Sequence, residues 1–154
     1  MEEKRWWYSA FRLSLSGVFL VAGSTKLWDL IVKGETGLVD WIAGLYEAEA
    51  FVPEFLVRAF GFMVPFAEFA LGVLLVLGIF RKATATFGIA LFGVFLFGSE
   101  IVHYQPNMIM DIIQQVVFLI SFVLLAVLRS HGDDPLSLDD IRTRRKVRTA
   151  APLT

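Results

Sequence analysis

The chain has 154 residues, of which 56% are hydrophobic and 19% charged, and its formal net charge is −1. Soluble domains usually contain about 45–50% apolar residues. The excess here is gathered in long blocks, with an overall mean hydropathy of +0.66, and predicts an integral membrane protein. The absence of cysteine excludes disulfides, thiol redox relays, iron–sulfur clusters and thiolate metal sites, and no metal site is expected.

Four apolar segments are long enough to cross a bilayer, which takes roughly 20 residues. They run over residues 6–30, 55–80, 83–102 and 107–128. The expected fold is therefore an all-α integral membrane protein, with a four-transmembrane-helix bundle in residues 1–130 and a cytoplasmic basic tail in residues 131–154. The first segment is longer than the apolar region of a signal peptide, so it is interpreted as a true span.

The distribution of lysine and arginine predicts the orientation of the spans. These residues occur before the first span (Lys4, Arg5), between the second and third spans (Arg81, Lys82), and after the fourth span from Arg129 onward. The positive-inside rule then places both termini and the second loop in the cytoplasm. The chain is expected to be a multi-pass protein of the cell inner (cytoplasmic) membrane.

The first loop contains a shorter helical pattern. Its apolar side consists of Leu38, Trp41, Ile42, Leu45 and Tyr46. Its polar side carries Asp40, Glu47 and Glu49. This spacing predicts an amphipathic helix that lies on the outer membrane interface, and a plain linker helix is the alternative.

The tail contains a helix start signal. Ser137 and Asp140 have the spacing of a capping box whose acid is shortened from Glu. A basic helix from Leu138 to about Arg148 would follow, and beside a membrane it would be attracted to anionic lipid. A partly disordered charged tail is the alternative.

Ionisable side chains inside the predicted spans are the candidate functional residues, because each costs about 2.5–3.5 kcal/mol at the centre of a membrane helix. Glu68 lies near the middle of the second span. Helical side chains lean toward the N-terminal end of their helix, so Lys26 in the first span and Glu68 lean toward each other. We expect them to pair in a polar pocket open to the outer face. The candidate pocket residues are Lys26, Glu68, Glu100, His103, Asp111 and Gln114.

The charge balance of this pocket indicates proton handling or binding of a polar head group. Three carboxylates would face one lysine and one histidine, so at least one carboxyl group is expected to be protonated near neutral pH. The alternative is a purely structural network that fixes the helix register. Two arginines are assigned to the inner face: Arg12, which is expected to snorkel toward the cytoplasm, and Arg81.

No covalent cofactor is expected, and the candidate non-covalent ligand is a quinone or another isoprenoid lipid. The 15 phenylalanines could form a wall around an isoprenoid tail. Phenylalanine is also an ordinary lipid-facing residue, and this simpler interpretation is favoured.

Three groups of residues resemble sequence motifs of a known family. The first is R-x4-G-x-F-x3-G-x2-K-L, at Arg12, Gly17, Phe19, Gly23, Lys26 and Leu27. The second is E-x3-G-x5-G-x2-R, at Glu68, Gly72, Gly78 and Arg81. The third is G-x-x-P-L-S-L-D from Gly132 to Asp139, which differs from a closing G-x-G-x-x-S-L-D motif by having Asp134 at the second glycine.

Together these motifs resemble the DoxX-like family of small four-helix membrane proteins. The resemblance covers nearly the whole chain. It implies a four-helix bundle and association with membrane redox complexes, including a subunit of thiosulfate:quinone oxidoreductase. Many members of that family have no assigned activity, so the resemblance supports the fold better than the chemistry.

Three functions are compatible with these features. The first is an accessory, non-catalytic membrane subunit of a respiratory-type oxidoreductase that contributes to a quinone or proton site, with electrons supplied by a partner. The second is a structural or assembly subunit of a larger bioenergetic or photosynthetic membrane complex. The third is a small-molecule or proton carrier. Membrane lipids and other subunits are the expected partners, and nucleic acid is not.

Overall fold

The computed structural model describes residues 3–34, 36–47, 53–102, 108–130 and 134–150, and their regular structure is entirely helical. The elements are α1 (Glu3–Leu27), the π-helical turn η1 (Trp28–Val32), α2 (Gly37–Glu47), α3 (Glu54–Leu77), α4 (Arg81–Val102), α5 (Met108–Ser130) and α6 (Leu138–Ala150). The predicted all-α class is therefore confirmed.

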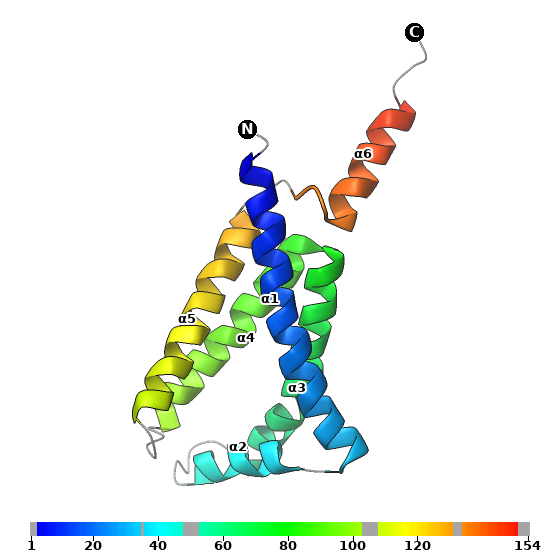
Figure 1. Ribbon diagram of the computed structural model, residues 1–154. Helices are drawn as coiled ribbons and strands as arrows, with labels where there is room; N and C mark the ends of the chain where they lie inside the picture. The colour runs from blue at the N-terminus through cyan, green and yellow to red at the C-terminus, as the bar shows by residue number, and fades with distance from the viewer. Residues whose placement is uncertain (1–2, 35, 48–52, 103–107, 131–133, 151–154) are drawn as a thin grey trace.

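The long helices form two pairs. Helix α1 packs along α3, and α4 packs along α5. Figure 1 shows that the pairs meet at the end where α1 begins and α6 projects, here called the tail end, and separate toward the other end. Helix α2 lies across α3 at that other end, here called the α2 end. The start of α1, the end of α5 and the turn between α3 and α4 all lie at the tail end.

The apolar core lies where the two pairs meet. Its buried residues are Leu15 and Phe19 of α1, Leu71 and Leu75 of α3, Leu91 and Phe92 of α4, and Leu125 of α5. The centre of the Phe92 ring lies 5.3 Å from the centre of the Phe19 ring and 5.6 Å from that of the Phe118 ring. Such aromatic pairs add to the stabilisation that comes from burying apolar surface.

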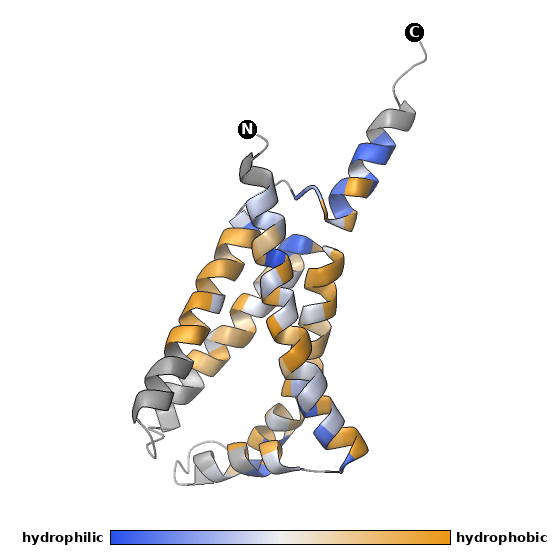
Figure 2. Cartoon of the chain, in the orientation of Figure 1, coloured by the Kyte–Doolittle hydropathy of each residue, from blue (hydrophilic) through white to orange (hydrophobic). Residues whose placement is uncertain are grey.

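The outer surface of the bundle is also apolar. Large side chains such as Val18, Val21, Phe62, Met63 and Ile120 are exposed, and Figure 2 shows hydrophobic residues along α3, α4 and α5 and hydrophilic residues in α6. A helix that is hydrophobic on every side is typical of a membrane span or a buried core helix.

Within the described residues, two helices are long and apolar enough to cross a membrane. They are Trp6–Val32, with a mean hydropathy of 1.4, and Glu54–Leu77, with a mean hydropathy of 2.1. A shorter apolar helix covers Val116–Ser130. The predicted count of four spans and their orientation stay predictions.

Close contact between α1 and α3 depends on a glycine. A Cβ atom at Gly23 would lie 2.5 Å from the backbone nitrogen of Phe69, a distance that no side chain tolerates. The absence of a side chain at Gly23 therefore lets the two helix backbones approach, as small residues do in membrane helix pairs. This contact is next to the polar residues of the same two helices.

The predicted helix in the first loop is confirmed. Helix α2 buries Val39, Ile42 and Ala43 and packs on α3 near Gly61, where an added Cβ would be 3.3 Å from the Cα of Val39. This helix therefore covers one end of α3. The side chains of Trp41, Leu45 and Tyr46 lie outside the described residues.

Candidate functional site

The first polar cluster is the Lys26–Glu68 pair, which joins α1 and α3. The Nζ atom of Lys26 donates hydrogen bonds to Oε1 and Oε2 of Glu68, both at 2.8 Å. The Glu68 side chain is 8% exposed and the Lys26 side chain 33% exposed. The predicted pairing of these two residues is confirmed, and it satisfies a carboxylate that would otherwise be buried alone in an apolar segment.

The other predicted pocket residues belong to α4, to α5 and to the segment between them. Glu100 belongs to α4, and Asp111 and Gln114 belong to α5, but their side chains lie outside the described residues. His103 lies between the described segments 53–102 and 108–130. The pocket as a whole, its excess of carboxylates and its quinone or proton role therefore stay predictions.

The second cluster lies at the tail end and centres on Arg12. The prediction that Arg12 snorkels was wrong, because the residue is only 3% exposed. Its Nε atom contacts Oδ2 of Asp134 at 2.5 Å, and its Nη1 atom donates to the carbonyl oxygens of Leu75 and Val76. The last carbonyls of a helix have no partner within it, so the end of α3 offers Arg12 acceptors inside the protein.

Asp134 receives several hydrogen bonds in this cluster. The Ser9 hydroxyl donates to Oδ1 at 2.5 Å, and the backbone N–H of Leu136 donates to the same atom at 3.2 Å. Burial alone raises the pKa of Asp134. The net effect is nevertheless a pKa below the ordinary value, because the carboxylate accepts hydrogen bonds from Ser9, Arg12 and the Leu136 N–H and lies beside the charge of Arg12. Asp134 is therefore ionised at neutral pH.

The start of α6 is attached to the same place. The Ser137 hydroxyl accepts from the backbone N–H of Asp140 at 3.1 Å, which is the N-cap interaction that the sequence predicts. The carboxylate of Asp140 does not complete a capping box. It accepts from the backbone N–H of Asp134 at 2.6 Å and pairs with Arg81 at 2.7 Å. The predicted basic helix is confirmed as α6 (Leu138–Ala150).

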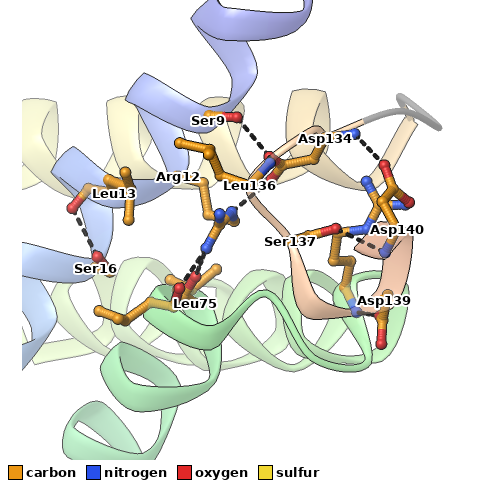
Figure 3. Close-up of polar contacts among 12 residues, drawn as sticks. Ser9, Arg12, Leu13, Ser16, Leu75, Asp134, Leu136, Ser137, Asp139 and Asp140 are labelled. Atoms are coloured by element: carbon orange, nitrogen blue, oxygen red, sulfur yellow. Dashed lines mark hydrogen bonds and ion pairs between the residues drawn. The ribbon is translucent and has the colours of Figure 1, made fainter. Parts of the chain in front are cut away.

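These contacts form one network, which we call the tail clamp and which Figure 3 shows in part. Its members are Ser9, Arg12, Arg81, Asp134, Ser137, Asp139 and Asp140. It joins α1, the α3–α4 turn and the segment before α6. Arg81 takes part through its side chain and also through its backbone N–H, which donates to Asp139 at 3.2 Å.

Gly78 gives the clamp its shape. It ends α3 with a φ of 61°, a conformation that favours glycine, and its N–H donates to the carbonyl oxygen of Leu74 at 2.9 Å. A Cβ atom here would be 2.6 Å from Cβ of Ser137 and 3.2 Å from Cζ of Arg12. The segment before α6 therefore lies directly against the end of α3.

Sequence reasoning missed most of the tail clamp. Asp134 was noticed only as a departure from a motif, and Ser9 was not noticed. One signal was available: the predicted topology places Arg12 and the acids after the fourth predicted span near the same membrane face. Within the described part of the chain, no group of three or more His, Asp or Glu residues could bind a metal ion.

Comparison with known proteins corrects the family assignment. The family model described as methylamine utilisation protein MauE matches residues 4–108. Comparisons with curated proteins and with solved structures give no match. The DoxX-like assignment was wrong: its motifs consist mainly of glycines and single charged residues, which many packed membrane helices need for close approach and pairing. Because the matched segment covers more than half of the sequence and includes α2, α3, α4 and all but the first residue of α1, this chain belongs to the MauE family.

Proposed function

We propose that this chain is an accessory membrane subunit of an oxidoreductase system that serves methylamine utilisation. The family match supports the biological context. The apolar helices Trp6–Val32 and Glu54–Leu77 support a place in the membrane. The observation that carries the proposal furthest is the Lys26–Glu68 pair, a charged pair between two such helices.

The chemistry of methylamine fits a redox system. Oxidation of methylammonium with water gives formaldehyde, ammonium, two protons and two electrons, so an electron acceptor is required. The chain has no cysteine and thus offers no thiol for electron transfer. We therefore assign the redox centre to a partner protein and an accessory role to this chain.

The proposed topology has four spans over residues 6–30, 55–80, 83–102 and 107–128, with both termini in the cytoplasm. Residues 131–154 would be a cytoplasmic tail, and the protein would be multi-pass in the inner membrane. The distribution of Lys and Arg supports this orientation. Helices α1 and α6 both start at the tail end (Figure 1), which is consistent with having both termini on the same side of the membrane.

The proposed chemical role of the Lys26–Glu68 pair is to bind a quinone head group or to transfer a proton. A lysine ammonium can donate to a quinone oxygen, and a carboxylate that exchanges its partner can accept a proton. Glu100, His103, Asp111 and Gln114 would extend this site from α4, α5 and the segment between them. A carboxylate inside a membrane span usually indicates such a function.

A matched pair of variants on α3 tests this role. Glu68→Gln removes the buried negative charge, and Glu54→Gln removes an exposed one whose side chain is 62% exposed. In a methylamine-utilising strain that carries only the variant gene, we expect Glu68→Gln to abolish growth on methylamine while the protein level in the membrane stays normal. Glu54→Gln should grow like the wild type. Normal growth of both variants would contradict the proposed chemical role.

A structural or assembly subunit is the second candidate. The tail clamp favours it, because this buried network joins three parts of the chain through hydrogen bonds and ion pairs. In that case Glu68→Gln would leave growth intact, and loss of Arg12 would remove the complex from the membrane. A proton or small-molecule carrier is the third candidate, although secondary transporters commonly use discontinuous helices around their sites.

A further inference from the structure

A small cavity lies beside the tail clamp, where the two helix pairs meet. Its volume is about 20 Å³. Residues of α1, α3, α4, α5 and the segment before α6 surround it, and its polar lining includes Tyr8, Arg12, Arg81, Thr84 and Asp134. The cavity is therefore bordered by both helix pairs and by the tail.

One nitrogen of Arg12 is buried without a hydrogen-bond partner. The Nε atom is used by Asp134, and Nη1 is used by the carbonyls of Leu75 and Val76, but Nη2 has no acceptor within the described part of the chain. Leaving a donor of a charged group unsatisfied inside a protein costs more than the roughly 1–3 kcal/mol of a neutral one. This atom requires an acceptor.

We infer that the cavity is a binding site for one ordered water molecule, which accepts a hydrogen bond from Nη2 of Arg12. A water needs about 10–15 Å³ of such space and two to four polar partners. The hydroxyl of Thr84 uses its proton on the carbonyl oxygen of Ile79 at 3.0 Å, so its lone pairs remain as acceptors for the water. The Asp134 carboxylate is a second acceptor on the same lining.

Size and charge both select water over an anion. A space of about 20 Å³ is sufficient for one water and too small for a phosphate or carboxylate group. The surrounding clamp already has three carboxylates, Asp134, Asp139 and Asp140, against the two guanidinium groups of Arg12 and Arg81. An additional negative charge would therefore be repelled.

The water adds a second polar connection between the α4–α5 pair and the clamp, beside the one that Arg81 makes at the start of α4. Arg12 belongs to α1 and Thr84 belongs to α4. Apart from the contacts of Arg81 in the clamp, the pairs α1–α3 and α4–α5 meet mainly through the apolar core. A water between these residues would hold the helix pairs together at the tail end, where Figure 1 shows them closest. Its removal should therefore loosen this junction.

A cavity-filling variant tests whether the space is dry, because only an empty space can accept added side-chain atoms with a gain in stability. Ala85 is 1% exposed and lines the cavity, and Ala85→Val adds two methyl groups to it. Ala90→Val on the exposed side of α4 controls for the effect of a β-branched residue on the helix. If water is present, Ala85→Val should lower the melting temperature of the full chain in detergent by on the order of 3 °C relative to Ala90→Val. A rise relative to the control would overturn the inference, because filling a dry void stabilises a protein.

An experimental structure of the wild-type chain at a resolution that shows waters decides the matter if either variant fails to fold. A water within hydrogen-bond distance of Nη2 of Arg12 is the expected result. An empty cavity, or one filled by a side chain, would contradict the inference.

Discussion

The Lys26–Glu68 pair and the tail clamp are two ways of placing charge inside the same apolar bundle. The first joins two long helices by one bidentate contact, and its lysine side chain is 33% exposed. The second surrounds the Arg12–Asp134 pair, whose side chains are 3% and 4% exposed, with hydroxyl, backbone and carboxylate partners. The clamp has the properties of a structural element, whereas the partly exposed lysine keeps the first pair accessible from outside the bundle.

The difference has an energetic consequence. Removing one partner of a fully buried ion pair leaves the other charge without compensation, which costs about 3–5 kcal/mol. Removing one partner of a partly exposed pair costs less, because water replaces the lost contact. The predictions below test this contrast, from the largest expected effect to the smallest.

Replacing Arg12 by leucine should have the largest effect. Arg12→Leu leaves the buried carboxylate of Asp134 without its cation and the carbonyls of Leu75 and Val76 without a donor. We expect a loss of about 3–5 kcal/mol in the free energy of unfolding, measured by denaturant titration in detergent micelles. The double variant Arg12→Leu/Asp134→Leu should recover part of this loss. If Arg12→Leu were as stable as the wild type, the tail clamp would not stabilise the fold.

Replacing Gly78 by alanine should cause the second-largest loss of stability. An alanine would have to adopt a φ of 61° and would place its Cβ 2.6 Å from Cβ of Ser137. The left-handed conformation costs about 1–2 kcal/mol and the contact adds to it, so we expect a total loss of about 2–3 kcal/mol. The matched control is Gly93→Ala, because an added Cβ there contacts nothing within 4 Å. Equal stability of the two variants would contradict the proposed packing.

Acid should weaken the clamp through Asp134. The pKa of this group is below its ordinary value of 3.8 in the folded chain, so its contribution to stability is fully present above that ordinary pKa and is lost as the pH falls through the lower, folded pKa. The melting temperature should therefore fall between pH 4 and more acidic values, and Asp134→Asn should reduce this fall.

The matched control for the acid experiment is Asp40→Asn. The hydrogen bond from Thr36 and the contact with Arg58 also lower the pKa of Asp40, but this carboxylate is exposed and solvent screens its interactions. Asp40→Asn should therefore leave the acid profile nearly unchanged. An Asp134→Asn variant with the wild-type profile would show that other groups cause the acid loss.

The two clusters also differ in how far they could be predicted from the sequence. The Lys26–Glu68 contact was predictable because helix geometry fixes the depth and direction of a side chain from its residue number. Asp134 lies before α6 in a segment with no periodicity, so nothing in its spacing indicates that it folds back to Arg12. Snorkelling was the default expectation for Arg12, but it failed because Asp134 and the end of α3 supply acceptors within the protein.

Helix positions were predicted well for a similar reason. Long apolar blocks indicated the helices, and the second predicted span, residues 55–80, differs from α3 (Glu54–Leu77) only at its ends. The predicted span ends three residues beyond the observed end of α3, because the apolar sequence continues through Ile79 and Phe80. The helix stops earlier because Gly78 adopts a left-handed conformation. The family was not predictable from these features, since short glycine motifs recur wherever membrane helices pack closely.

The smallest effect on stability is expected for Lys26→Met. The methionine keeps most of the apolar part of the side chain and removes the ammonium group, leaving Glu68 beside a partly exposed position. Because the Lys26 side chain is 33% exposed, water replaces part of the lost contact, and we expect a loss of about 1 kcal/mol in the free energy of unfolding. If Lys26→Met proved as destabilising as Arg12→Leu, the pair would belong with the clamp as a structural element, and its proposed role in proton or quinone chemistry would lose its main support.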